Sequence, residues 1–215
     1  RLTKVTGVQT CALPIFSDAL RYEVADELRS RIRQEDRFDA DLDAMLGVLP
    51  SYTQLGMAAL LPHKTLAHSH DGDPVVVDGQ RCDGTANRNK VLAPVDGFAI
   101  QAEDVFAMSS SELRELYVAH RVLYVYHDRI DATGDKARTE RQVFEAADRA
   151  LGDLVSLIKR LANANATNIL VTADHGFLYQ DTALADTFYL STKPQGDELV
   201  VVNEEIGRAS CRERV

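Results

Sequence analysis

Two apolar strands flank a long amphipathic helix in the C-terminal half of the chain, and this order constrains the fold more than any other feature. Residues 122–126 (VLYVY) and 169–172 (ILVT) are apolar throughout, which is typical of strands buried on both faces. A stripe with helical spacing lies between them, at Val143, Ala147, Ala150, Leu154, Leu157 and Leu161. Such a unit joins parallel strands of one sheet. The pattern therefore predicts an α/β fold, a three-layer sandwich with a mostly parallel central sheet.

The remaining segments extend this pattern. Helical spacing predicts a first helix through Leu20, Val24, Leu28 and Ile32. Shorter helices are expected over residues 53–61, which end before Pro62, and over 109–117, where Ser109 to Ser111 supply the cap. Residues 63–89 read as a polar loop that a short strand at 75–77 interrupts, and residues 198–202 (ELVVV) as a third buried strand. Ligands of open α/β sheets bind beyond the carboxyl ends of the strands, so the residues that follow each strand are the candidates for a site.

Both ends of the chain differ in character from its middle. Residues 1–16 and 207–215 hold two of the three cysteines and resemble translated sequencing-adapter readthrough. We therefore expect a non-native leader at 1–16, a partial domain at 17–206 and a non-native tail at 207–215. Pro14 has no backbone N–H to donate to a ladder, so the leader is also expected to fit poorly as a central strand.

Charge and composition exclude some classes of function. Lys and Arg number 24 against 33 Asp and Glu, a net charge of −9, which argues against a broad groove for nucleic acid. No apolar stretch approaches the roughly 20 residues of a membrane span. A single internal cysteine, Cys82, without a secretory signal predicts a reducing, cytoplasmic compartment. Walker, Rossmann and G-x-S-x-G motifs are absent, so nucleotide kinases, dehydrogenases and serine hydrolases lose support.

Imidazole and carboxylate groups follow two of the predicted strands. Asp174 and His175 follow 169–172 after one residue, Ala173, and His127 and Asp131 follow 122–126. These ligand types suit zinc or manganese. The alternative for each pair is an ordinary turn with solvated polar side chains, and each pair alone leaves that alternative open.

Two more residues have both a chemical and a structural interpretation. Asp18 precedes the first helix, where it is either a metal ligand after an upstream strand or, like Ser17, a helix cap. Thr53 opens a short helix, where its hydroxyl is either a nucleophile that needs activation or a plain N-cap. A further polar cluster reads mostly as a solvated loop, with metal contact as the minor alternative: His63, His68, His70, Asp71 and Asp73.

The order of four segments along the chain is more specific than any one of them. They are SDALRYE, PSYTQLGMAALLP, YVYHDRIDATGDK and VTADHGFLY. This order resembles the PglZ family of the alkaline phosphatase superfamily, whose members accompany phage-exclusion (BREX-type) defence systems, and the resemblance covers residues 17–206.

The resemblance implies roles for six residues. Thr53 matches the nucleophile, Asp18, Asp174 and His175 match ligands that with Thr53 hold one ion, and His127 and Asp131 look like ligands of a second ion. Two departures stand out: many members place Asp before His in the second pair, whereas this chain has His first, and no His follows His175.

The function implied by the resemblance is a metal-dependent phosphatase of a phage-defence system. It would use two divalent ions, zinc by preference and manganese as the alternative, on a phosphate ester of unknown identity. Other proteins of the defence system are the expected partners, and no membrane is expected. Nucleic acid stays open as a partner, although the net charge does not support it. Two alternatives stay open: an inactive binding module of the defence complex, and a phosphodiesterase or nuclease on the same metal centre.

Overall fold

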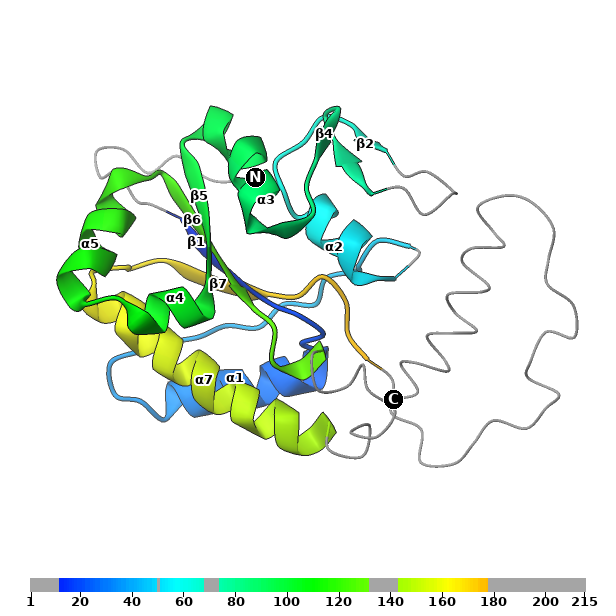
Figure 1. Cartoon of the computed structure of the whole chain (residues 1–215). Coiled ribbons are helices and arrows are strands. Elements are labelled where there is room, and N and C mark those ends of the chain that lie inside the picture. The colour runs from blue at the N-terminus through cyan, green and yellow to red at the C-terminus, as the bar shows by residue number, and fades with distance from the viewer. Residues whose placement is uncertain (1–11, 50, 68–73, 132–142, 178–215) are drawn as a thin grey trace, which may run out of the picture.

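A parallel sheet of four strands forms the centre of the computed structural model, which describes residues 12–49, 51–67, 74–131 and 143–177 (Figure 1). The strands lie in the order β5-β6-β1-β7. Their bounds are β1 Leu13–Ser17, β5 Gly97–Gln101, β6 Val122–His127 and β7 Ile169–Thr172. The prediction of an α/β fold with a mostly parallel central sheet is confirmed.

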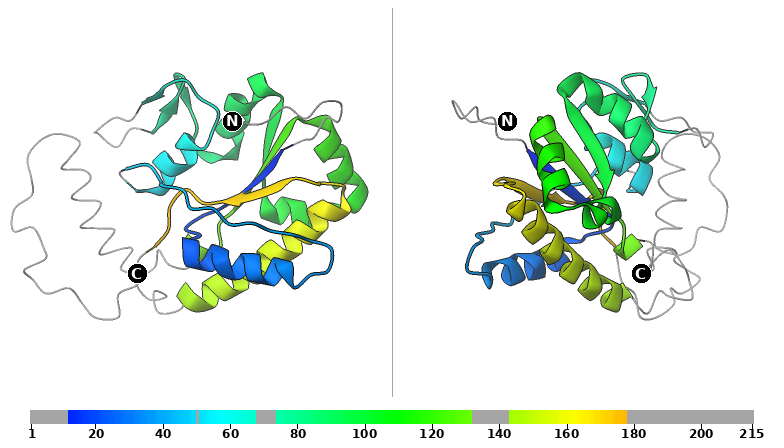
Figure 2. Two further views of the ribbon diagram at one scale, coloured as in Figure 1. Left: turned by 180° about the vertical axis from the view of Figure 1, so that it is seen from behind. Right: turned by 60° about the vertical axis from the view of Figure 1, so that its left-hand side comes forward.

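Helices cover both faces of this sheet, as the three views show (Figures 1 and 2). Leu13 and Ile15 of β1 pack into a core shared with helices on one face. These helices are α1 (Tyr22–Arg33), α4 (Ala102–Ala107), α5 (Ser110–Ala119) and α7 (Val143–Asn163). Phe16 points to the other face, where it packs with α2 (Thr53–Ala59) and α3 (Gly84–Leu92). Successive strand residues point to opposite faces, so a strand buried on both sides must be apolar throughout.

Pro14 lies inside a central strand, contrary to our expectation. β1 pairs with β6 on one side and with β7 on the other, and Pro14 is in register with Leu170 of β7. The ladder to β6 is interrupted at Pro14, between the isolated bridge Ala12–Val122 and the pair Ile15–Val125. One missing donor therefore interrupts one ladder locally, while both neighbouring strands still hold β1. Residues 1–11 lie outside the described part, so a non-native leader stays a prediction, as does the tail.

The predicted helices are found, with differences at their ends. Ser109 caps α5 as expected, because its hydroxyl accepts a hydrogen bond from Glu112 N and the Glu112 carboxylate accepts one from Ser109 N. Neither Ser17 nor Asp18 caps α1, which begins after Arg21 without a side-chain cap. This removes the capping interpretation of Asp18.

The segment between α2 and β5 holds more structure than the predicted loop. A small antiparallel sheet contains β2 (Leu66–Ala67), β3 (Val76–Val77) and β4 (Gln80–Arg81), so the strand expected at 75–77 is present. The loop prediction is wrong from Gly84 onward, where α3 begins, followed by the 3-10 turn η1 (Ala93–Val95). β5 was missed altogether.

The strand predicted at residues 198–202 lies outside the described part of the chain. Among the described residues, no helix combines the length and the apolarity that crossing a membrane requires.

Candidate metal centre

The carboxyl ends of three neighbouring strands meet at one place, and each is followed by polar side chains. Asp18 follows β1, Asp131 lies four residues beyond the end of β6, and Asp174 and His175 follow β7. In a parallel sheet these ends share one edge, so the order β6-β1-β7 brings the three loops together. Thr53 reaches the same place as the first residue of α2.

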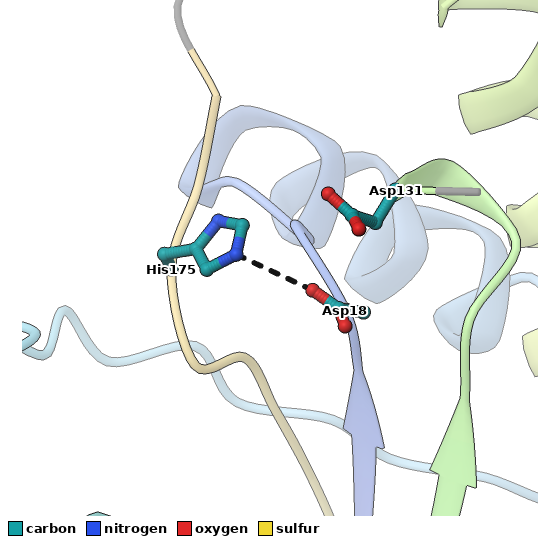
Figure 3. A group of neighbouring side chains, drawn as sticks. All are labelled: Asp18, Asp131 and His175. Carbon is teal, nitrogen blue, oxygen red and sulfur yellow. Dashed lines mark ion pairs between the residues drawn. The ribbon is translucent and has the colours of Figure 1, made fainter. Parts of the chain in front are cut away.

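Asp18, Asp131 and His175 form a group whose candidate ligand atoms all lie within 4.8 Å of one another (Figure 3). The side chains point toward a common centre from three separate segments, of which the one that holds Asp131 is a helical turn after β6. His175 Nε2 is 3.4 Å from Asp18 Oδ1 and also 3.4 Å from Asp174 Oδ2. Two carboxylates and an imidazole around one point are a donor set for a divalent cation such as zinc or manganese.

The tautomer of His175 follows from its hydrogen bonds. Nδ1 lies 2.9 Å from the carbonyl oxygen of Gly176, which can only accept, so Nδ1 carries the proton in the neutral ring. Nε2 is then an acceptor, and Thr53 Oγ1, 3.0 Å away, donates to it. In this tautomer Nε2 has no proton to give to the oxygens of Asp18 and Asp174, each 3.4 Å away, so a cation bound among these three groups would satisfy all of them.

The burial of two carboxylates also favours a cation at this centre. Asp18 and Asp174 are each only 5% exposed, and within the described part Asp18 Oδ1 and Asp174 Oδ2 have no hydrogen-bond partner. Burial raises the pKa of Asp18 to about 9, and the charges of Asp174, Asp131 and Asp128 add to the shift. Burial also raises the pKa of Asp174, although His175 acts in the opposite direction. Buried carboxylate oxygens without donors are costly unless a proton or a metal ion satisfies them, so the residues fit a cation site.

A glycine lets α2 approach this centre closely. A Cβ atom on Gly56 would lie 2.8 Å from the backbone oxygen of Asp174, which cannot move without displacing the Asp174–His175 loop. Gly56 is buried with Leu55, Met57 and Ala58, and this packing fixes the helix that begins at Thr53. Close contact between α2 and the β7 loop thus sets the position of the Thr53 hydroxyl.

We expect Gly56→Ala to lower the free energy of unfolding by about 1–3 kcal/mol, because the added methyl overlaps backbone. Gly152→Ala is the matched control: Gly152 also lies inside a helix, but nothing is within 4 Å of its Cβ position. That control should be neutral or stabilising by up to about 1 kcal/mol. Urea unfolding of both variants measures the difference, and equal effects would contradict the close-approach argument.

His127 does not join the group of Asp18, Asp131 and His175. Its Nδ1 lies 3.0 Å from Ser17 Oγ, and its Nε2 lies 3.7 Å from Asp153 Oδ2. Burial lowers the pKa of His127, partly opposed by the charge of Asp153. The pairing of His127 with Asp131 that the sequence suggested is therefore not seen; Asp131 lies with Asp18 and His175 instead.

Sequence reasoning missed two acidic residues near the centre. Asp128 is exposed but close enough for its charge to raise the pKa of Asp18. Its position directly after β6 is the same signal that pointed to Asp174, so it could have been found. Asp153 lies within α7 and faces His127 and Arg129. No local pattern marks it, because its role depends on how α7 packs against β6.

The histidine cluster near residue 63 gives no second site in the described part. His63 Nδ1 donates to the carbonyl oxygen of Leu61 at 2.7 Å, a local contact that fixes the turn after α2. His68, His70, Asp71 and Asp73 lie outside the described residues.

Comparison with known proteins adds to this geometry. A family model, the BREX system PglZ alkaline phosphatase-like domain, matches residues 7–205. The chain is 48% identical over 185 residues to the alkaline phosphatase-like protein BrxZ of Escherichia coli O9:H4 (strain HS). It is 44% identical over 188 residues to the alkaline phosphatase-like protein PglZ of Bacillus cereus (strain H3081.97). These alignments cover 84% and 86% of this chain but 21% of each relative. No solved structure matches the chain significantly.

Proposed function

The chain belongs to the BREX system PglZ alkaline phosphatase-like family, and from this premise we propose that it is a metal-dependent phosphoryl-ester hydrolase with Thr53 as its nucleophile. The observation that carries the proposal is the contact of Thr53 Oγ1 with His175 Nε2 at 3.0 Å, beside two buried carboxylates. A hydroxyl is a weak nucleophile by itself, and coordination to a metal ion is one of the ways in which enzymes activate it.

The proposed ligands are Asp18, Asp131, Asp174 and His175. A divalent cation, when bound, supplies positive charge that favours the deprotonated hydroxyl and offsets the charge of the phosphoryl oxygens. His175 keeps Nε2 directed at the centre because its Nδ1–H is held by the carbonyl oxygen of Gly176. The buried carboxylates balance the charge of the ion, which the acidic composition of the chain accommodates.

The residues of the chain divide the reaction into two steps. Thr53 Oγ1 forms a bond to phosphorus as the bond from phosphorus to the leaving oxygen breaks, and the hydroxyl proton passes to that oxygen, which leaves a phosphothreonine and a free alcohol. Water then attacks the phosphorus of that ester, the bond to Thr53 Oγ1 breaks, and a proton from the water restores the hydroxyl as phosphate is released. The N-terminal position of Thr53 in α2, fixed by the contact of Gly56 with Asp174, holds the attacking oxygen still in both steps.

The chain spans about a fifth of the length of the relatives above, so its partners and its substrate class are also proposals. We place its partners among the other proteins of a phage-defence system, in keeping with the BREX family. The substrate class is a phosphate ester. Among the described residues, one group of side chains could hold a metal ion. The second ion expected from the sequence stays a prediction.

Removal of metal tests the proposal. We expect the purified protein to bind zinc or manganese, to gain about 2.7 kcal/mol of stability at an ion concentration 100 times the Kd, and to hydrolyse an aryl phosphate ester. A chelator should abolish hydrolysis, and the ion should restore it. Metal analysis distinguishes one bound ion from two. Ion binding without hydrolysis would favour the binding module, and hydrolysis that survives complete removal of metal would contradict the proposal.

A further inference from the structure

A buried contact lies directly beneath the candidate metal centre, between the last residues of β1 and β6. Ser17 and His127 are partners in the parallel ladder, and both are buried, at 0% and 3% exposure. Asp18 N donates to the carbonyl oxygen of His127 at 2.8 Å. The backbone that carries Asp18 is therefore attached to His127.

The side chain of His127 adds a second attachment. Nδ1 and Ser17 Oγ share a hydrogen bond of 3.0 Å, so His127 holds the residue next to Asp18 as well. On its other side, Nε2 faces Asp153 of α7 at 3.7 Å, and Asp153 is ion-paired with Arg129. The ring thus lies between the end of β1 and the helix that covers this face. Neither nitrogen belongs to the group formed by Asp18, Asp131 and His175.

We propose that His127 is a positioning residue rather than a metal ligand: through Ser17 it fixes the Asp18 carboxylate for cation binding. This inference rests on the proposed metal function. A buried hydroxyl that loses its partner must find another, and here the backbone beside Asp18 would have to move for it to do so. Loss of a residue that orients a metal ligand without binding the metal itself usually lowers metal affinity by about 10–100-fold.

The chemistry of the side chains gives a selective test. The Asn amide lies as many bonds from Cβ as His Nδ1 does, whereas the Gln amide corresponds to Nε2. His127→Asn therefore retains a partner for Ser17, and His127→Gln does not. Ser17→Ala removes the contact from the other side with a smaller change in volume. Ser156→Ala is the matched control, because its exposed hydroxyl bonds only to Gly152 O within α7 among the contacts described.

Mn²⁺ titration calorimetry of the purified protein and these variants provides the readout. We expect Ser17→Ala and His127→Gln to bind Mn²⁺ about 10–100-fold more weakly with the number of ions unchanged. His127→Asn should stay within about threefold of the unsubstituted protein, as should Ser156→Ala.

Three results would overturn the proposal. Loss of a bound ion in His127→Asn would make His127 a ligand. Unchanged affinity in Ser17→Ala would show that the contact does not position Asp18. If His127 had a purely structural role, both His127 variants would melt at a lower temperature, but His127→Asn and His127→Gln would bind Mn²⁺ with the same affinity. If the unsubstituted protein binds no Mn²⁺ or Zn²⁺, the proposed function fails first and takes this inference with it.

Discussion

Replacing Thr53 with alanine is expected to slow hydrolysis of an aryl phosphate ester by at least about 10³-fold, because the attacking oxygen is removed. Metal binding should persist, since Asp18, Asp131 and His175 remain in place. Steady-state rates at saturating metal, combined with a metal titration, measure both effects on the same variant.

Thr53→Ser serves as the control for this prediction. Serine keeps the hydroxyl that contacts His175 Nε2, so most of the activity should be retained. Trapping after a brief reaction with substrate should give a phosphorylated residue in the unsubstituted protein and none in the alanine variant. Unchanged hydrolysis by Thr53→Ala would reject the nucleophile assignment while leaving the cation site intact.

Replacing Asp18 with asparagine is expected to change function and stability in opposite directions. Metal affinity should fall by at least about 100-fold, because a ligand charge is lost at the centre. The metal-free protein should become more stable by about 1–2 kcal/mol, because a buried carboxylate oxygen without a donor is replaced by an amide that can donate to Asp174 or His175. Mn²⁺ titration and urea unfolding without metal measure the two effects; loss of stability together with unchanged affinity would contradict the assignment.

The pH dependence of the metal-free protein gives a second readout for Asp18. Its pKa is about 9 in the folded protein and about 3.9 when unfolded, so the folded state binds more protons between these values. The contribution of Asp18 to stability is present below about pH 4 and is lost as the pH rises toward about 9. The free energy of unfolding of the metal-free protein should therefore decline over this range, and Asp18→Asn should flatten the decline. Equal slopes for the two proteins would show that Asp18 is not the group concerned.

The central part of the fold could be predicted because its signals are local. The apolar run of β6 and the stripe of α7 report burial on both faces of a strand and on one face of a helix. The run at 169–172 does form a strand, but its expected burial on both faces is wrong, because β7 is the edge strand of the described sheet and Leu170 is 62% exposed. β5 was missed because its five residues, GFAIQ, begin with glycine and end with a polar residue, which gives a weak strand signal. Pro14 gave a misleading signal. Proline is rare in central strands because it lacks one hydrogen-bond donor, but here the pairing of β1 on both sides and the burial of its side chains outweigh that loss.

The site was predictable only as a set of residue types at strand ends. Asp18, Thr53, Asp174 and His175 were named from position and resemblance, and the structure places them together. The partner of each side chain was not predictable: Asp131 and His127 lie four residues apart, yet one faces Asp18 and the other faces Ser17 and Asp153. That difference depends on the path of a short loop and on the helix packed beside it.

The sequence alone determined that this chain folds around a parallel sheet and that its carboxylates and histidines follow the strands, because hydrophobic periodicity is a property of neighbouring residues. The tertiary structure decided which of them meet. Strand order places β1 between β6 and β7, and close packing at Gly56 brings Thr53 to His175 across 122 residues of chain. Contacts over such separations depend on how whole elements pack, so no local pattern encodes them.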